Sequence, residues 1–275
     1  MIAKLISKNK FLKNKLLTLS VEHLKRNPGD VEYLILQVRD DAKKVFDKYP
    51  LILNPPNPHI EKVINLVKYF SLPEENCIVD VGASNGVVAK RFAQAFPGTL
   101  IYSFEPVLNT FKQLQKSVSS FSNIQIVNKG LGCITERMNI HIADRASSSS
   151  FLEIKKNISN EYLSKNIRLN TIQQAEISTL DTEIPKDKKV NILKLDVQGF
   201  ELKVLKGGNE LLKRTNIVVL EMQNHDLYLD APKYYELDDF LRIQGFELFD
   251  IIPSLRQDMK LYEWDGIYIS KNIGM

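Results

Sequence analysis

Acidic residues and glycines stand at the ends of short apolar runs in this sequence, where they could bind a ligand through hydrogen bonds. The run CIVDVG (77–82) contains Asp80 and Gly82 and leads through Ala-Ser-Asn to Gly86. Gly82 lets the backbone turn sharply and approach a ligand without a Cβ clash. Gly86 opens a helix-like run, whose first N–H groups favour a carboxylate or phosphate. A tight strand–helix turn without a ligand is the alternative.

A second acidic position, Glu105, ends the apolar run TLIYSFEP (99–106), 19 residues after Gly86. A carboxylate at this place in an open parallel sheet accepts the two hydroxyl donors of a ribose. Pro106 suits the first turn of the next helix. Alone, Glu105 would equally suit a helix N-terminus, which also favours a carboxylate. Its distance from the glycine loop favours the ribose site.

Further polar residues follow two later apolar runs. Asp196 ends the run NILKLD and shares strand phase with Gln198, while Glu221 ends NIVVLE shortly before His225. The carboxyl ends of parallel strands meet at one rim, where ligands bind. A desolvated acid there has a raised pKa and can serve as a general base. Asp196, Glu221 and His225 are therefore catalytic candidates; helix caps, turn formers and a structural histidine are the alternatives.

Strand-like and helix-like runs alternate from residue 76 onward, which predicts a parallel sheet covered on both faces. The strands are predicted at 77–82, 99–106, 123–128, 191–199 and 216–222, with helices at 86–96, 107–118, 200–214 and 231–245. We expect a break at Gly207-Gly208 and a helix stop at Gly245. Two closing strands without a helix between them predict a hairpin, so that one edge strand runs antiparallel. The alternating run 137–143 predicts an extra strand. The polar segment 144–176 predicts either an insertion whose serines, Ser147–Ser150, contact the hydroxyl groups of a cofactor or a substrate, or a flexible tip.

In order, these blocks resemble the FkbM family of S-adenosylmethionine-dependent methyltransferases. They are D-V-G-A-S-N-G (80–86), F-E-P (104–106), S-S near 148–150, S-T-L-D (178–181), K-L-D-V-Q-G-F-E (194–201) with V-L-K-G-G, and V-L-E (219–221). The resemblance covers roughly residues 60–270. It implies an α/β, Rossmann-like class I methyltransferase fold, with a seven-stranded, mostly parallel sheet and an antiparallel edge strand, preceded by N-terminal helices. It also implies O-methylation, commonly of a sugar hydroxyl in glycans or secondary metabolites.

The resemblance assigns roles to individual residues. Those that would hold S-adenosylmethionine are Asp80, Gly82, Ser84, Asn85 and Gly86 in the loop, Glu105 and Pro106 at the ribose, Asn128 or Gly130 beside the adenine, and Asp196 where cofactor and acceptor meet. The family pattern usually has Asn at Ser84, often a second proline at Leu108, and frequently Glu at Gln198. Gln198 cannot act as a base or an anionic metal ligand, so we assign it hydrogen bonding alone. No metal site is predicted.

Composition excludes several classes of protein. The chain has 275 residues, of which 44% are hydrophobic, enough for a full core and unlike collagen, disordered or disulfide-stapled chains. Its apolar runs are shorter than the roughly 18 residues of a membrane span. The net charge is +4, but residues 1–26 carry about +6, which leaves about −2 for the rest. This distribution argues against a nucleic-acid partner. Cys77 and Cys133 fit no metal motif.

The N-terminal part is interpreted as a separate helical extension (1–58) before a methyltransferase domain (59–275). Residues 1–26 predict a basic amphipathic helix that lies on an anionic membrane, docks on a partner, or caps the domain. A second helix is predicted at 31–49, followed by a proline-rich linker at 53–59. The sequence lacks the apolar core of a secretory signal, so we expect a cytoplasmic protein with an optional peripheral membrane contact. The oligomeric state stays undetermined.

Three other functions were weighed against methyl transfer to a small-molecule or glycan acceptor. A NAD-type oxidoreductase is disfavoured because the glycine spacing is G-x-x-x-G, not G-x-G-x-x-G, and no P-loop G-K-[ST] follows. A non-catalytic binding subunit with the same cofactor fold is disfavoured by the retained acidic and glycine residues. A nucleic-acid methyltransferase is disfavoured because Asn54-Pro55-Pro56-Asn57 precedes the cofactor domain.

Overall fold

A computed structural model describes residues 58–143, 149–155, 169–225, 227–257 and 259–273. The helices predicted at 1–26 and 31–49 lie outside the described residues, so the division into an extension (1–58) and a domain (59–275) stays a prediction. No helix in the described part of the chain is long and apolar enough to cross a membrane.

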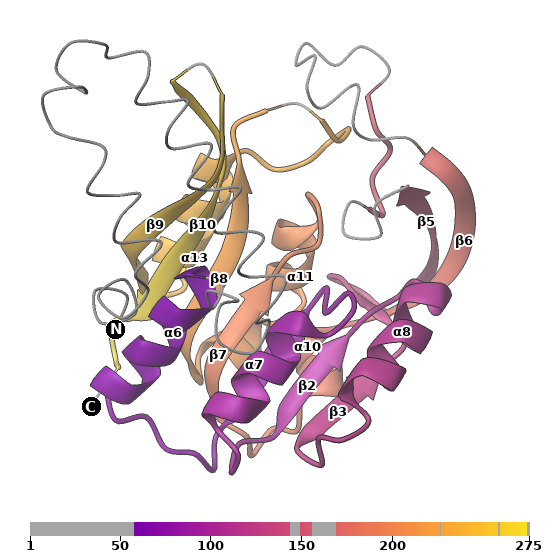
Figure 1. The fold of residues 1–275 in the computed structure, drawn as a ribbon. Helices are drawn as coiled ribbons and strands as arrows, with labels where there is room; N and C mark the ends of the chain where they lie inside the picture. The colour runs from indigo at the N-terminus through magenta and orange to yellow at the C-terminus, as the bar shows by residue number, and fades with distance from the viewer. Residues whose placement is uncertain (1–57, 144–148, 156–168, 226, 258, 274–275) are drawn as a thin grey trace, which may run out of the picture. The chain divides into compact units, whose positions relative to one another are not determined.

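Seven strands form the main sheet, in the order β3-β2-β1-β7-β8-β10-β9 (Figure 1). Their bounds are β1 (Cys77–Val81), β2 (Ile101–Phe104), β3 (Ile124–Val127), β7 (Val190–Leu195), β8 (Thr215–Gln223), β9 (Phe246–Gln257) and β10 (Lys260–Ser270). The first five strands of this order pair in parallel, and β10 pairs antiparallel with both β8 and β9. The predicted seven-stranded, mostly parallel α/β class is confirmed. The predicted hairpin lies at one edge, where β10 runs antiparallel and β9 is outermost.

Helices cover both faces of this sheet, which is why β1 and β7 are buried along their whole length. One face carries α6 (Pro58–Tyr69), α7 (Val87–Ala95) and α8 (Leu108–Val118). The other carries α10 (Leu180–Glu183), α11 (Glu201–Lys206), α12 (Asn209–Leu212) and α13 (Tyr234–Ile243). A hydrophobic core lies on each face of the sheet, and successive residues of β1 point into opposite cores. Ile78 packs in one core with Phe92 of α7, and Val79 packs in the other with Leu205 and Leu241.

Glycines end helices where the sequence predicts it. The chain leaves the helical path between α11 and α12 at Gly207-Gly208, as predicted. A Cβ on Gly207 would lie 1.9 Å from the carbonyl oxygen of Gly132, so this close approach requires glycine. Gly245 follows α13 with φ +88, the left-handed conformation that stops a helix, also as predicted.

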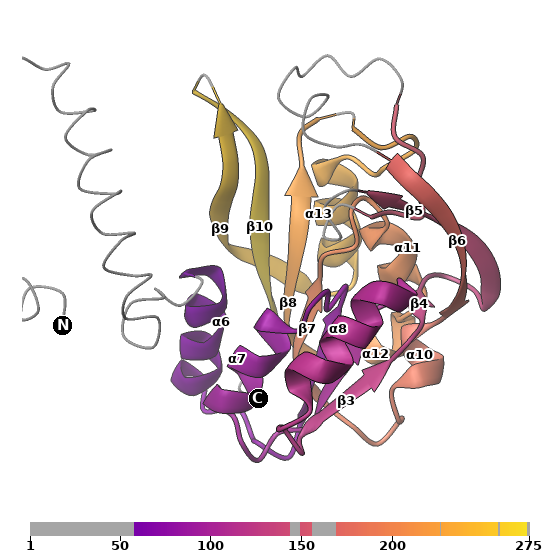
Figure 2. The same ribbon diagram turned by 45° about the vertical axis from the view of Figure 1, so that its right-hand side comes forward.

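A second, three-stranded sheet lies beside α8, on the opposite side of the molecule from the β9–β10 hairpin (Figure 2). It contains β4 (Gly130–Leu131), β5 (Glu136–Ala143) and β6 (Leu169–Ser178). The strand predicted at 137–143 is confirmed as β5. The segment predicted as a polar insertion includes most of β6, whose Ala175 and Ile177 are buried while Gln174 and Glu176 are exposed. The polar character of the segment therefore belongs partly to the outer face of a strand.

Candidate active site

The chain turns from β1–β2–β3 on one side of the sheet to β7–β8 on the other, so β1 and β7 flank the switch point where ligands bind in such sheets. The loop after β1 packs against the end of β7 there. Gly82 has φ +79, and a Cβ on it would lie 1.9 Å from the carbonyl oxygen of Asp196. Ser84 (φ +47) and Gly86 (φ +82) continue this left-handed path into α7, while the Asn85 side chain is exposed.

Glu105 lies directly opposite this loop. Its Oε2 accepts a hydrogen bond from the backbone N–H of Ser84 (3.0 Å), and its Oε1 accepts one from the N–H of Val107 (2.9 Å). The side chain is 6% exposed, and burial raises the pKa of Glu105 to about 7, although the two N–H donors oppose this shift. Asn128 braces the position, since its amide donates to the backbone carbonyls of Glu105 (2.8 Å) and Pro106 (3.2 Å).

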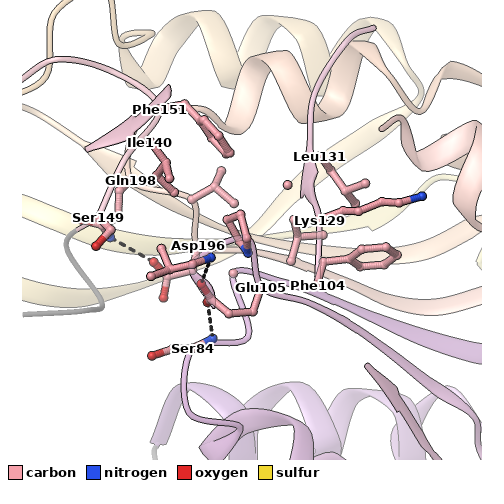
Figure 3. Close-up of a pocket in the computed structure, with 16 residues that line it drawn as sticks. Ser84, Phe104, Glu105, Lys129, Leu131, Ile140, Ser149, Phe151, Asp196 and Gln198 are labelled. Atoms are coloured by element: carbon pink, nitrogen blue, oxygen red, sulfur yellow. Dashed lines mark hydrogen bonds between the residues drawn. The ribbon is translucent and has the colours of Figure 1, made fainter. Parts of the chain in front are cut away.

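A cavity opens between these groups, with a polar wall and an apolar wall (Figure 3). Its lining comprises Val81, Gly82, Ser84, Phe104, Glu105, Pro106, Val107, Lys129, Gly130, Leu131, Ile140, Ser149, Phe151, Asp196, Val197 and Gln198. Gly130 leaves room for the ring of Phe151, because a Cβ at position 130 would lie 2.6 Å from Cζ of that ring. A flat apolar wall next to a buried carboxylate suits a nucleoside, with its base on the apolar side and its ribose hydroxyls on Glu105.

Asp80 lies behind the wall of this cavity. Its side chain is fully buried, and Lys194 Nζ lies 3.4 Å from its Oδ1. No hydrogen-bond donor from the described residues meets either oxygen. Burial raises the pKa of Asp80, and Lys194 opposes the rise. Burial also lowers the pKa of Lys194, but Asp196 and Asp80 outweigh it, so Lys194 keeps its charge. Lys194 therefore links the buried Asp80 to Asp196, which lines the cavity.

Asp196 lines the cavity from the end of β7, with a side chain that is 42% exposed and 3.5 Å from Lys194 Nζ. Gln198 Nε2 donates to Asp196 Oδ1 (3.0 Å) and to Oε2 of Glu221 (2.9 Å), which comes from β8. Burial raises the pKa of Glu221 well above its ordinary range, and the neighbouring carboxyl of Asp196 raises it further. The structure thus brings two of the three predicted catalytic residues together.

His225 lies apart from the cavity lining. Its side chain is 3% exposed, and its Nε2 lies 2.9 Å from Oε1 of Glu263 on β10. The backbone N–H of Leu227 donates to its Nδ1 (3.3 Å), so Nδ1 is the acceptor and the proton sits on Nε2. These partners match the structural alternative for His225.

Several residues of the site had no assigned role in the sequence analysis. Glu201 begins α11, and its Oε1 accepts from the N–H groups of Val197 (3.1 Å) and Gly199 (3.2 Å). Burial raises its pKa to about 7. Its place in the block K-L-D-V-Q-G-F-E was the available signal. Lys194 shares that block, whereas Phe151 and Tyr228 carry no signal because loops far apart in sequence bring them to the site.

The serine run is split between the site and its support. Ser149 lines the cavity, and Ser150 donates its hydroxyl proton to the carbonyl oxygen of Gln198 (2.7 Å). Ser147 and Ser148 lie outside the described residues. No group of three or more His, Cys, Asp or Glu side chains in the described ranges could hold a metal ion.

A seven-stranded sheet of this order, with a nucleoside-shaped site beyond the strand ends at the switch point, defines a class I methyltransferase fold. The methyltransferase FkbM domain family matches residues 80–248, more than half of the chain. The protein therefore belongs to the FkbM family, and it is an S-adenosylmethionine-dependent methyltransferase. The donor set fits that cofactor: Glu105 would hold the ribose hydroxyls, and Gly130 and Phe151 would flank the adenine.

Two curated relatives are methyltransferases. Methyltransferase 1 of Beauveria bassiana (strain ARSEF 2860) is 27% identical over 163 residues, which cover 54% of this chain and 66% of that protein. The 2-O-methyltransferase NoeI of Sinorhizobium fredii (strain NBRC 101917 / NGR234) is 23% identical over 184 residues, covering 64% of this chain and 74% of that protein. The chain thus spans about two thirds to three quarters of these relatives.

Solved methyltransferase structures are more distant. The magnesium protoporphyrin IX methyltransferase ChlM from Synechocystis PCC 6803, with bound SAM, is 13% identical with a TM-score of 0.43, over 78% of this chain and 80% of that one. An S-adenosylmethionine-dependent methyltransferase from Clostridium acetobutylicum ATCC 824 is 7% identical with a TM-score of 0.45, over 85% of this chain and 99% of that one.

Proposed function

We propose that the protein is an O-methyltransferase that acts on a sugar hydroxyl of a glycan or a glycosylated metabolite. The observation that carries the proposal is the Asp196 carboxylate, which lies on the cavity wall and is partly exposed. An alcohol acceptor needs a base, whereas many other methyl acceptors do not. The similarity to a 2-O-methyltransferase supports the choice of oxygen as the acceptor atom.

The chemistry divides between the cofactor and the chain. S-adenosylmethionine supplies a methyl group on a positively charged sulfur, which makes the carbon electrophilic. With the cofactor bound, Asp196 would accept the proton of the acceptor hydroxyl, and the methyl group leaving the sulfur would pass to the acceptor oxygen. Lys194 Nζ lies 3.5 Å from Asp196 Oδ2 and places a positive charge beside this carboxylate. Alignment of the hydroxyl with the methyl group supplies the rest of the rate.

An acceptor screen tests the proposal. The protein is incubated with methyl-labelled S-adenosylmethionine and a panel of free oligosaccharides and glycosides, and mass spectrometry follows the gain of one methyl group. We expect label on an O-linked methyl of at least one sugar. Label transfer to amines or thiols, with none to hydroxyls, would contradict it. Calorimetry with S-adenosylhomocysteine, run in parallel, shows that the protein sample is competent to bind the cofactor product.

Asp196→Asn separates proton acceptance from binding. The amide keeps the size of the side chain and cannot take up the proton. We expect turnover to fall about 100-fold or more, since general-base catalysis contributes about that much. Calorimetric affinity for S-adenosylhomocysteine should change far less. Full turnover by Asp196→Asn would show that Asp196 is not the base.

The proposal extends to partners. The acceptor is a small molecule or glycan rather than nucleic acid, and the basic segment 1–26 provides a peripheral membrane contact. That segment lies outside the described residues.

A further inference from the structure

One amide joins the two carboxyl groups at the ends of neighbouring strands. Gln198 Nε2 lies 3.0 Å from Oδ1 of Asp196 and 2.9 Å from Oε2 of Glu221. A primary amide nitrogen carries two N–H donors, so each carboxyl group receives one. The ends of β7 and β8 are therefore tied together by a side chain that carries no charge.

Tyr228 fixes the orientation of this amide. Its hydroxyl donates to Gln198 Oε1 (2.9 Å), and its ring is buried in a small cluster with Leu227, Leu152 and Ile154. If the amide were turned over, Oε1 would face two carboxyl groups and the nitrogen would face a hydroxyl. The orientation with nitrogen toward the acids is the one that gives all three partners a hydrogen bond.

The backbone of Gln198 adopts a conformation that favours glycine. Its φ is +55, and Gly199 follows with φ +93. A non-glycine residue in this region costs about 1 kcal/mol and persists where its surroundings impose it. The hydroxyl of Ser150, 2.7 Å from the carbonyl oxygen of Gln198, is one such constraint. The unusual turn is held in place from the side of the cofactor cavity, which Ser149 and Phe151 line.

Charged and titratable groups approach the two carboxyls from several elements. They are Asp80 and Lys194 from β1 and β7, Glu201 from α11, Glu263 and Asp265 from β10, and His225 and Tyr228 from the chain after β8. Asp196 forms an ion pair with Lys194. None of the ion pairs among the described residues includes Glu221. Gln223 Nε2 donates to the same Oε2 of Glu221 (3.0 Å). Glu221 therefore accepts hydrogen bonds from two amides, whereas Asp196 also lies beside the Lys194 cation.

We propose that Gln198 is the positioning residue of this site. Its uncharged amide fixes the Asp196 carboxyl beside the cavity and joins that carboxyl to the carboxyl of Glu221. Gln198 takes no proton itself and acts through the two acids. This inference rests on the proposed function, in which Asp196 receives the hydroxyl proton.

The titration of the two carboxyl groups tests the inference without an acceptor. Protein labelled with ¹³C at Asp and Glu side-chain carboxyls is followed by NMR across the pH range, with Asp196→Asn and Glu221→Gln assigning the signals. Gln198→Met removes both donors and keeps the side-chain length. Because N–H donors favour the charged form, we expect both midpoints to rise by about one pH unit.

Gln223→Met is the matched control. Gln223 donates to Glu221 and not to Asp196 among the described contacts. We therefore expect the midpoint of Glu221 to rise in this variant while that of Asp196 stays at its wild-type value. If both midpoints rise in Gln198→Met and only the Glu221 midpoint rises in Gln223→Met, Gln198 is the group that joins Asp196 to Glu221.

Unchanged midpoints in a Gln198→Met protein with wild-type circular dichroism would overturn the inference. If that variant does not fold, Tyr228→Phe decides, since it keeps the ring and loses the hydroxyl that orients the amide. We expect smaller rises of both midpoints in Tyr228→Phe, and their absence refutes the inference. Coupled midpoints together with a failed acceptor screen would support the positioning role and reject the proposed O-methylation, so the two failures are distinguishable.

Discussion

At the residue scale, the site is unusual for its buried carboxyl groups. Burial raises the pKa of Glu105 and Glu201 to about 7 and that of Glu221 well above its ordinary range. Each group then binds protons more tightly in the folded chain than in the unfolded chain. The contribution of Glu105 and Glu201 to stability is fully present below the unfolded pKa near 4.5 and is lost as the pH rises to about 7.

We therefore expect the protein to unfold more easily at pH 8 than at pH 5.5, and Glu201→Gln to reduce this difference. The glutamine keeps the oxygen that accepts from Val197 and Gly199 and removes the charge. The reduction is at most roughly 2 kcal/mol, because only the part of the Glu201 pKa shift that lies between pH 5.5 and about 7 falls within this comparison. Urea unfolding at the two pH values measures it. An equal pH dependence in wild type and variant would contradict the buried, protonated state of Glu201.

Glu105→Gln probes the ribose site. Glu105 now accepts backbone N–H bonds at both oxygens, and an amide would turn one of these acceptors into a donor facing an N–H. The variant also loses charge toward the ribose hydroxyls. We expect affinity for S-adenosylhomocysteine to fall about 10-fold or more, as hydrogen bonds to charged groups contribute about 1.5–3 kcal/mol. Isothermal titration calorimetry measures this, and unchanged affinity would remove Glu105 from the cofactor site.

At the scale of elements, the site depends on the contact between the β1–α7 loop and the end of β7. The N–H of Asp196 donates to the carbonyl of Val81 (3.1 Å) across this contact, and the N–H of Gly82 donates to the carbonyl of Phe104 at the end of β2 (3.0 Å). Gly82 makes the approach possible because it has no side chain between the two segments. The loop and the strand end are therefore joined through their backbones.

Gly82→Ala should destabilise the fold by about 3 kcal/mol or more, since the new Cβ would clash with backbone at 1.9 Å and φ is +79. Gly245→Ala is the matched control: φ is +88, but no atom lies within 4 Å of its Cβ position. That variant should lose only about 1 kcal/mol. Thermal unfolding of both proteins gives the comparison, and equal losses would show that the close contact contributes little.

At the scale of the whole molecule, charge is distributed unevenly: residues 1–26 carry about +6 and the remainder about −2. Every residue of the candidate site lies after residue 79. We expect deletion of residues 1–26 to leave S-adenosylhomocysteine affinity unchanged within about 2-fold and to weaken binding to anionic vesicles. Calorimetry and vesicle sedimentation measure the two effects. Loss of folding on deletion would show that these residues belong to the domain.

Much of the fold was predictable because local pattern and tertiary arrangement agree. Buried strands such as 77–82 and 216–222 are apolar runs, the helices have a helical period, and the helix break at Gly207-Gly208 has a direct signal. The strand β6 was harder to predict because polar residues occupy its outer face and Gln173 points inward to contact the carbonyl of Pro106. A half-polar strand resembles a loop when it is considered alone.

The candidate site was predictable in its residue types more than in its contacts. Glu105, Gly82 and Asp196 meet at one cavity, as expected for residues that end neighbouring parallel strands. Asp80 also stands near the end of a strand, but its side chain is buried and pairs with Lys194 rather than lining the cavity. His225 follows β8, yet it turns to Glu263 of a strand that comes nearly forty residues later.

The sequence by itself determined the order of elements, the family and the acids at the strand ends, because these follow from local residue patterns. Tertiary structure alone decided which carboxyl groups lie close enough to change one another's pKa. Three features depend on segments that are distant in the chain: the burial of Glu221 near α11 and β10, the positive φ of Gln198, and the hydrogen bond from Tyr228 to Gln198. Desolvation and hydrogen bonding act over a few ångströms of space, and sequence separation does not reveal those distances.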